Sequence, residues 1–467
     1  MAAAAFWMAA WWITEAVPLF LTALLPLILF PLTGVMKAAA TAPLYINSTI
    51  FLFIGGFLIA LTIEKWNLHK RIALFIIRLI GGGPRRIVLG FMVAAAGLSM
   101  WISNTATAIM MVPIGLAVIQ RMEAQFGAEA CRRFSISLML GIAYGCSIGG
   151  IATLVGTPPN LSLSRIFTIT FPDAPPIGFG TWMMMALPIT AILLLCAWLL
   201  LTLVFFRASA DLHIPDSIIK QEYSRLGAMR YEEKATLAVF LSTACLWVFR
   251  GDLRLGFATL PGWSRLMPYP EFIDDGTVAL IMATLLFLLP SHTPRKSPKL
   301  ADAGILNRLP WGIVLLFGGG FALAKGFQVS SLSDFIGMRF QSLGGLPPLL
   351  SILGICLVIS FLTELTSNTA TTEMVLPVIA AVALAIGINP LFLMVPATLS
   401  ASCAFMMPVA TPPNAIVFGS QRLRIADMSR VGVVLNVIGA VVITLVFYVL
   451  GRLVFGIDVS SLPAWAH

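Results

Sequence analysis

Long apolar runs dominate the chain, and their lengths predict helices that cross a membrane. A helix needs roughly 17–25 apolar residues to span the hydrocarbon core of a bilayer. Runs of this length, or shorter and interrupted ones, lie at 134–164, 181–206, 309–324, 390–420 and 429–450, and at 2–13, 17–33, 48–63, 235–250 and 272–290. We therefore predict an all-α polytopic membrane protein with about ten transmembrane helices.

Four further features interrupt this pattern and come in two pairs. The segments 87–119 and 347–385 are too long for one simple helix, and each has Ser-Asn-Thr near its middle, at 103–105 and 367–369. Two half-length helices that meet at the tripeptide describe each segment better, which predicts two re-entrant helical hairpins. The runs 134–170 and 390–420 contain Thr-Pro-Pro-Asn, and proline ends one helix and suits the first turn of the next. They are predicted to be two broken helices.

The two halves of the chain repeat one another. Gly55-Gly56-Phe57 matches Gly319-Gly320-Phe321, and Ser103 matches Ser367, in both cases at an offset of 264 residues. The sequences GTPPN at 156–160 and ATPPN at 410–414 match at an offset of 254. Each repeat has an odd number of crossings, so the second copy must be inverted in the membrane. Inverted repeats with broken helices are typical of secondary transporters.

These features divide the chain into four parts. The predicted division is a first inverted repeat at 1–206, a cytoplasmic linker at 207–234, a second inverted repeat at 235–455 and an outer C-terminal tail at 456–467. The segments 64–80 and 327–343 are amphipathic and are predicted to lie along the two membrane surfaces.

Composition and charge support a membrane protein and argue against a nucleic-acid partner. Hydrophobic residues make up 59% and charged residues 10% of the 467, and the mean hydropathy is +0.96. The net charge of +9 is explained by loops, because 21 of the 29 Lys and Arg residues fall in alternate connecting segments. Such an excess marks the cytoplasmic side. These segments are 64–86, 120–133, 207–234, 291–308 and 421–430.

The polar tripeptides suggest binding chemistry at the hairpin tips. Ser103 and Ser367 are candidate caps of a half-helix, whose free N–H groups and positive dipole end attract a carboxylate. The other half arrives with carbonyl and hydroxyl oxygens, which suit a hard cation such as Na⁺. Ser99 lies four residues before Ser103, and Thr363 has the same relation to Ser367, so the hydroxyls of each pair share a helix face.

The Thr-Pro-Pro-Asn motifs complete the scheme. Thr157 and Thr411 are expected to cap new half-helices, and Gly156 and Ala410 to end the preceding halves with free carbonyls. We thus expect one cation site per repeat and one shared anion site. Neither polar motif contains Lys or Arg. A bound dianion would therefore depend on helix dipoles and cations, each anion–cation contact contributing on the order of 4 kcal/mol at about 4 Å.

Several stretches together resemble one known family. WWITEAVPLFLTALLPLILFPL, EKWNLHKRIAL, SMWISNTATAIMMVPI, GTPPN, TELTSNTATTEMVLPV and ATPPNAIVFG are similar to the divalent anion/sodium symporters, over nearly the whole chain. The resemblance implies a homodimeric, elevator-type importer of C4-dicarboxylates (succinate, malate, fumarate) driven by sodium, multi-pass in the inner (plasma) membrane. It also implies one sodium site at Ser99, Ser103, Asn104 and Gly156, a second at Thr363, Ser367, Asn368 and Ala410, and substrate contacts from Asn104, Thr105, Asn368, Thr369, Thr411 and Pro412.

Two departures from the family pattern stand out. Members usually have one more helix before WWITEAVP, whereas this chain starts inside the next one. Glu373, four residues after Thr369, occupies a position that is usually uncharged, and its first-repeat counterpart is Ile109. An acid on a hairpin helix is costly. Two interpretations of Glu373 stay open. In the first, its side chain points into a polar crevice and only packs or hydrogen-bonds there. In the second, it titrates, and so makes transport depend on pH or alters the cation dependence. Glu15 and Glu364 match the family and are interpreted as structural.

Three alternatives are weighed against this interpretation. A sodium-independent dicarboxylate exchanger would have altered cation positions, and the hydroxyls of Ser99 and Thr363 favour symport. Citrate or sulfate as substrate depends on pocket size and stays open. An intramembrane enzyme would need a nucleophile with a base, paired aspartates or metal ligands, and the core helices contain no such motif. The six cysteines read as small apolar residues, not as bridges or ligands.

Overall fold

The computed structural model describes residues 1–207, 217–254, 259–293, 297–340, 347–458 and 461–466. Parts of the predicted linker 207–234, of the surface segment 327–343 and of the tail 456–467 therefore lie outside the described residues. The predicted all-α fold is confirmed: almost every element is a helix, and the strands β1 (Leu253–Arg254) and β2 (Thr259–Leu260) form one two-residue antiparallel pair.

Helices of the length and apolarity that a bilayer requires recur along the chain. Among the described residues, six reach both criteria: Ala38–Lys65, Asn104–Phe126, Phe179–Phe205, Trp311–Val329, Asn368–Ala385 and Ile425–Phe455. Shorter apolar helices lie at Ala2–Thr14, Leu19–Leu32, Asp275–Leu288, Pro348–Leu362 and Leu391–Ala401. The predicted hairpins and broken helices contribute several of these, because each is divided into two helices.

The first half of the chain builds a run of helices up to residue 205. They are α1 (Ala2–Thr14), α2 (Leu19–Thr22), α3 (Leu25–Leu32), α4 (Ala38–Thr41), α5 (Ser48–Lys65), α6 (Leu68–Ile80), α7 (Pro84–Ser99), α8 (Asn104–Phe126), α9 (Ala128–Gly150), α10 (Pro158–Thr170) and α11 (Phe179–Leu199), which continues as a π-helix over Leu200–Phe205.

The second half repeats this order after a connecting region. Helix α12 (Ser217–Arg225) leads to α13 (Tyr231–Val248), α14 (Asp275–Leu288), α15 (Trp311–Val329), α16 (Leu332–Phe340), α17 (Pro348–Leu362), α18 (Asn368–Ala385), α19 (Leu391–Ala401), α20 (Pro412–Gly419) and α21 (Ile425–Phe455). Short 3₁₀ turns cover Ala42–Tyr45, Trp263–Leu266, Pro270–Phe272, Ala303–Arg308 and Ala464–Ala466.

The starts of the helices reproduce the offsets found in the sequence. The first residues of α6, α7 and α8 lie 264 positions before those of α16, α17 and α18, and α10 starts 254 positions before α20. The change of offset arises mainly inside helices: α18 is five residues shorter than α8, and α19 is twelve shorter than α9. The inverted orientation of the two halves remains a prediction.

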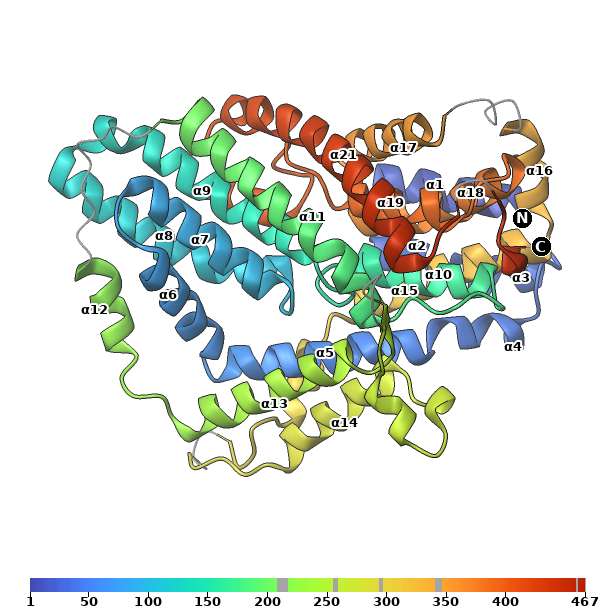
Figure 1. The fold of residues 1–467 in the computed structure, drawn as a ribbon, viewed down its shortest axis with the longest axis horizontal. Coiled ribbons are helices and arrows are strands. Elements are labelled where there is room, and N and C mark those ends of the chain that lie inside the picture. The colour runs from blue at the N-terminus through green and yellow to red at the C-terminus, as the bar shows by residue number, and fades with distance from the viewer. Residues whose placement is uncertain (208–216, 255–258, 294–296, 341–346, 459–460, 467) are drawn as a thin grey trace.

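The two hairpins pack around the broken helices (Figure 1). Helices α7 and α8 lie against α9, and α17 lies against α19. The second halves of the broken helices cross to the other repeat, since α10 packs on α18 and α20 packs on α8. Each hairpin therefore packs against elements from both halves of the chain.

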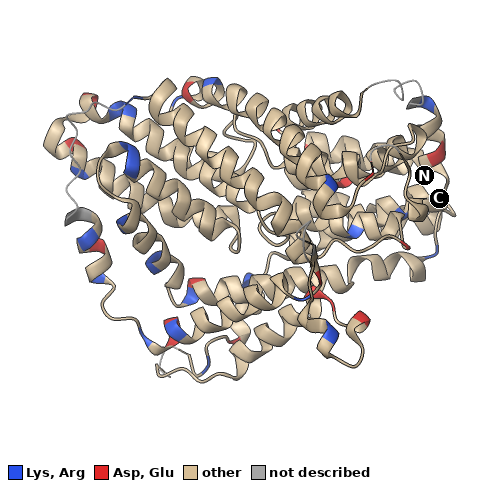
Figure 2. Ribbon diagram, viewed as in Figure 1, with Lys and Arg blue, Asp and Glu red and all other residues tan. Residues whose placement is uncertain are grey.

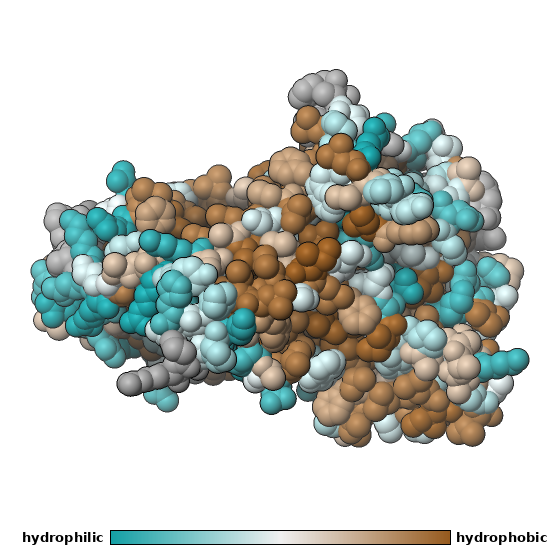
Figure 3. Space-filling model, turned by 90° about the horizontal axis from the view of Figure 1, so that it is seen from below, coloured by the Kyte–Doolittle hydropathy of each residue, from teal (hydrophilic) through white to brown (hydrophobic). Residues whose placement is uncertain are grey.

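The surface has the distribution expected in a bilayer. Lys and Arg gather at one end of the molecule, on the left in Figure 2, around α6, α12 and the turn between α8 and α9. Figure 3 shows hydrophilic residues concentrated at this end and a broad apolar surface beside it. On α21, exposed apolar residues recur every four positions and form an outward stripe: Val433, Val437, Val441, Leu445, Val449 and Leu453.

Helix α6 is amphipathic and anchored by a buried ion pair. Leu68, Leu74 and Ile77 are buried, whereas Leu79 is 74% exposed. The guanidinium of buried Arg71 donates to both carboxylate oxygens of Glu233 at the start of α13, at 2.9 and 3.1 Å, and to backbone carbonyls of 226–228. This pair fixes the predicted surface helix to the second half of the chain.

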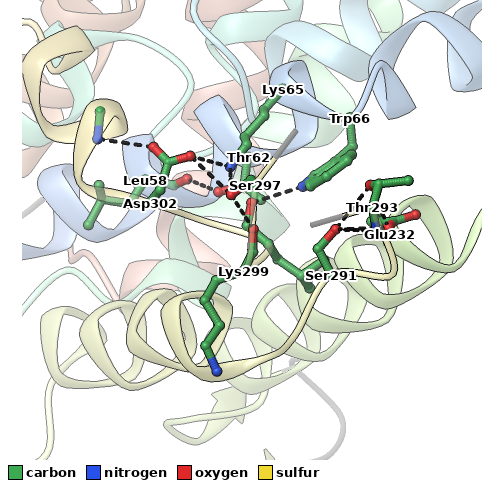
Figure 4. A network of polar contacts seen from close by, with 12 residues as sticks. Leu58, Thr62, Lys65, Trp66, Glu232, Ser291, Thr293, Ser297, Lys299 and Asp302 are labelled. Carbon is green, nitrogen blue, oxygen red and sulfur yellow. Dashed lines mark hydrogen bonds and ion pairs between the residues drawn. The ribbon is translucent and has the colours of Figure 1, made fainter. Parts of the chain in front are cut away.

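A second polar network joins the C-terminal end of α5, which leads into α6, to the segment before α15 (Figure 4). Lys65 donates to Asp302 at 2.6 Å and to Ser297 at 2.9 Å, and the Trp66 indole donates to the carbonyl of Leu300. Nearby, Glu232 accepts from the hydroxyls of Ser291 and Thr293. Helices α5, α6, α13 and α14 are thereby tied together at the Lys- and Arg-rich end.

Candidate functional site

Both predicted hairpins break at the Ser-Asn-Thr tripeptides. Helix α7 ends at Ser99 and α8 begins at Asn104, whereas α17 ends at Leu362 and α18 begins at Asn368. The Ser103 hydroxyl accepts from the backbone N–H of Ala106 at 3.2 Å, as a capping serine does. Ser367 has the same position before α18, but its side chain makes no capping hydrogen bond.

At each tip, a hydroxyl at the end of the first half-helix meets an amide at the start of the second. Ser99 donates to the side-chain oxygen of Asn104, and Thr363 donates to that of Asn368 at 2.6 Å. Ser99 and Thr363 are fully buried, at 0% exposure. Thr363 also reaches the carbonyl of Ala401, the last residue of α19, at 3.0 Å. Each tip thus gathers neutral oxygen atoms within a few ångströms, an environment that suits a hard cation.

The broken helices are confirmed, but their upstream halves end earlier than predicted. Helix α9 ends at Gly150 and α19 at Ala401, so the expectation that Gly156 and Ala410 end these helices is wrong. Irregular segments follow, and they hold Gly156 and Ala410 just before Pro158 and Pro412. Thr411 caps α20 by accepting from the N–H of Asn414 at 3.4 Å. Thr157 has the corresponding position but makes no capping hydrogen bond.

The asparagine of each Thr-Pro-Pro-Asn motif holds the irregular segment together, a role that the motif alone does not predict. The Asn160 amide donates to the carbonyls of Gly150, Ile151 and Thr153, at 3.3, 3.2 and 2.7 Å. The Asn414 amide donates to the carbonyls of Ala404 and Met407, at 3.1 and 3.0 Å. Both side chains are fully buried, and among the described residues neither amide oxygen has a hydrogen-bond partner.

Glycines at 150 and 156 allow the first break to approach the first tip closely. A Cβ atom on Gly150 would lie 2.7 Å from the side-chain oxygen of Asn104, and one on Gly156 would lie 2.5 Å from the carbonyl oxygen of Gly150. Any larger residue would push these groups apart. Gly156, Asn104 and Ser99 therefore lie at one place, as the resemblance implied for the first cation site.

Glu364 supports the second break and does not face an open site. Its carboxylate accepts the backbone N–H groups of Phe405, Met406 and Met407, at 2.6, 2.9 and 3.1 Å, and the amide of Asn436 at 2.8 Å. This confirms the structural interpretation of Glu364. The interactions order the segment between α19 and Ala410.

A cavity of about 520 Å³ leads to the first tip. It lies between α5 and α8, and its lining includes Ser103, Thr105 and Ile109. At the Lys- and Arg-rich end it is bordered by Glu64 and Arg308, which form an ion pair at 2.8 Å. On the corresponding side of the second repeat, α18 packs along α15.

The predicted site residues fall into two groups. Ser99, Asn104 and Gly156 lie together at the first tip, and Thr363 and Asn368 lie together at the second. Of the predicted site residues, Ser103 and Thr105 line the cavity of about 520 Å³ between α5 and α8. Its lining does not include Asn368, Thr369, Thr411 or Pro412. Helix α20, which starts at Pro412, packs on α8, which starts at Asn104.

The amino-acid sequence matches a known protein family. Residues 1–457 match the family described as the sodium:sulfate symporter transmembrane region. The chain belongs to this family. Its members are transporters, so the chain is a multi-pass membrane transporter and not an enzyme. The family and its bacterial members place it in the plasma membrane.

Relatives within the family are similar over nearly the whole chain. The sodium-dependent dicarboxylate transporter SdcS of Staphylococcus aureus is 42% identical over 461 residues, which cover 97% of this chain and 86% of SdcS. The SdcS of Staphylococcus saprophyticus is 42% identical over 460 residues, with the same coverage.

Two solved structures have a similar fold. The YdaH transporter of Alcanivorax borkumensis has a TM-score of 0.58 and 14% identity, covering 91% of this chain and 89% of the other. MtrF of Neisseria gonorrhoeae has a TM-score of 0.57 and 12% identity, covering 91% and 85%. At this identity the likeness concerns the fold alone.

Proposed function

We propose that this protein is a sodium-coupled importer of C4-dicarboxylates such as succinate, malate and fumarate. The observation that carries the proposal is the hydroxyl–amide pair that recurs at both hairpin tips, Ser99 with Asn104 and Thr363 with Asn368. It is supported by the relatives of 42% identity that are named as sodium-dependent dicarboxylate transporters.

Sodium would bind at two sites built from neutral oxygens. The first would use Ser99, Ser103, Asn104 and Gly156, and the second Thr363, Ser367, Asn368 and Ala410. In the part of the chain that the structure describes, no group of three or more His, Cys, Asp or Glu residues could hold a metal ion. The amide oxygens of Asn160 and Asn414, which have no hydrogen-bond partner among the described residues, are further acceptors beside the two breaks.

The dicarboxylate would bind between the tips through Asn104, Thr105, Asn368, Thr369, Thr411 and Pro412. Helices α8, α18 and α20 begin at these residues, and their free N–H groups and positive dipole ends favour carboxylates. Each helix end contributes only about half a charge, so the two sodium ions complete the neutralisation. Binding of anion and cation is therefore interdependent, as coupled transport requires.

The transport cycle would move the hairpins and broken helices against the remaining helices, as in an elevator. The packing of α10 on α18 and of α20 on α8 supports a single moving body made from both repeats, 1–206 and 235–455. The cavity beside Thr105 would be the path to the predicted cytoplasmic side. We further propose a homodimer, in which the fixed helices of two copies meet.

Uptake of radiolabelled succinate into proteoliposomes tests the proposal. We expect accumulation with an inward sodium gradient and none with an inward potassium gradient. Uptake into succinate-loaded liposomes that needs no sodium would instead identify an exchanger. Stronger inhibition by unlabelled citrate or sulfate than by unlabelled malate would refute a C4-dicarboxylate preference.

A further inference from the structure

Glu373 is a fully buried acid that the proposed transport site does not use. It lies on α18 at 0% exposure, where this helix meets α10 and α15. One carboxyl oxygen is hydrogen-bonded to the hydroxyl of Ser162 on α10. The other has no hydrogen-bond partner among the described residues. A Cβ atom on Gly320 of α15 would overlap this second oxygen, so the glycine makes room for the carboxyl group.

Charged groups on the surrounding helices do not neutralise Glu373. Helix α10 carries Arg165, α15 carries Lys325, and α16 carries Asp334 and Arg339. Helices α1 and α19, which also pack on α18, contain no charged residue. Among the described residues, no ion pair joins Glu373 to any of these groups. A buried carboxylate with a single hydroxyl partner is strongly unfavourable, so this packing favours the neutral acid.

In the first repeat the corresponding interface, between α8 and α5, is open. Ile109, the counterpart of Glu373, is 58% exposed and lines the cavity between α8 and α5. Gly56, the counterpart of Gly320, has only ordinary contacts with Val155 and Trp247. If the two repeats exchange roles during transport, α18 separates from α15 and Glu373 reaches water. There the ionised carboxylate is stable.

We propose that Glu373 is a proton-binding site that couples the conformation of the transporter to the pH of the predicted outer side. Protonation favours the conformation described above, in which α18 is closed on α15. Ionisation favours the opposite one. The inference rests on the proposed movement of the hairpins and broken helices against the remaining helices. The proton binds from the outer solution and returns to it, because Glu373 is not among the residues that line the cavity to the other side.

Exposure of position 109 reports this equilibrium without any transport. The test uses inverted membrane vesicles, in which the predicted cytoplasmic face points outward and the lumen corresponds to the outer side. The full chain carries I109C in a background where Cys196 and Cys245 are replaced, since the other four cysteines are buried. A membrane-impermeant maleimide is added outside at constant pH, without sodium or substrate, and only the lumenal pH is varied.

We expect labelling to be about threefold or more faster at a lumenal pH of about 5.5 than at about 8, since one linked proton shifts the equilibrium by at most tenfold per pH unit. With E373Q, which keeps the neutral shape, labelling should be fast at both values. With S162A, which removes the hydroxyl partner, the response should shift to lower pH. The matched control D173N removes an exposed carboxylate on the same predicted side and should leave the response unchanged.

A pH response that persists in E373Q, or a parent protein without one, would overturn the proposal. If E373Q does not fold, S162A still tests the proposal. A pH response of labelling that is not shifted in S162A would contradict the proposal. The labelling assay contains no substrate, so it can show a response to lumenal pH even if the protein does not transport succinate. The two proposals therefore fail separately.

Discussion

Thr363 donates a hydrogen bond to the side-chain oxygen of Asn368 at 2.6 Å, and Ser99 makes the same contact with Asn104 in the first half of the chain. In both pairs the hydroxyl closes the first half of a hairpin and the amide opens the second. Because the pair recurs at an offset of 264 residues, each of the two hairpin tips has one hydroxyl oxygen and one amide oxygen in the same arrangement. Each pair satisfies its own polar atoms inside an apolar protein, and its recurrence at both tips is what the proposal of two cation sites builds on.

Removal of either hydroxyl should weaken the response to sodium. We expect S99A and T363A each to raise the sodium concentration for half-maximal succinate uptake by about tenfold, since one oxygen contact to a charged group contributes about 1.5 kcal/mol. The measurement is initial uptake against sodium concentration at constant ionic strength. The controls S99T and T363S keep a hydroxyl and should stay within about threefold of the parent protein. Equal loss in the alanine and hydroxyl-retaining variants would contradict the assigned role.

The asparagines of the broken helices should matter for stability as well as for transport. N160A removes a donor that three buried carbonyls share. Those of Ile151 and Thr153 keep the Trp182 indole and the Gly156 N–H as donors, whereas that of Gly150 loses its donor among the described residues, at a cost of about 1–3 kcal/mol. We expect a lower unfolding temperature in detergent, measured by tryptophan fluorescence, and little stabilisation by added sodium. N389A is the matched control, because among the described residues the side chain of this buried asparagine has one hydrogen bond, which it accepts from the N–H of Leu391. A larger loss in N389A than in N160A would refute the assignment.

The sequence predicted the breaks well because polar and proline residues mark them. A Ser-Asn-Thr tripeptide in an apolar run cannot be satisfied by a continuous helix in lipid, and the structure breaks at 100–103 and 363–367. It did not predict where α9 ends, because Ile151, Ala152, Leu154 and Val155 continue the apolar run. The irregular backbone there is held by Asn160, whose hydrogen bonds hydropathy does not reveal.

The contact of Glu373 with Ser162 also could not be predicted from the sequence. The two residues are 211 positions apart and belong to different repeats, so only the packing of α10 on α18 brings them together. The sequence did identify Glu373 as an unusual acid on a hairpin helix. It left open whether the side chain meets water, and the structure places it in a closed interface.

The Lys65–Asp302 pair should make stability depend on pH in acid. The hydrogen bond from Lys65 lowers the pKa of Asp302, against a smaller opposing effect of burial. A carboxyl whose pKa is lowered by folding stabilises the protein above its unfolded pKa of about 4, and this contribution is lost as the pH falls through the folded value. We therefore expect D302N to lower the unfolding temperature at pH 7, and the difference from the parent protein to shrink below about pH 4. A difference that is constant from neutral to acid pH would contradict this role.

The buried pair of Arg71 and Glu233 should be worth far more than a surface pair. Both side chains are less than a tenth exposed, and Arg71 also satisfies the carbonyls of Leu226 and Gly227. R71A leaves a buried carboxylate without its cation, for which we expect a loss of about 3–5 kcal/mol in the free energy of unfolding. The matched control R225A breaks a pair with Glu222 in which the arginine is 74% exposed, and should cost less than about 1 kcal/mol. Urea unfolding in detergent micelles compares the two. Because Arg71 fixes α6 to the start of α13, similar losses in both variants would mean that this helix is held by its apolar face alone.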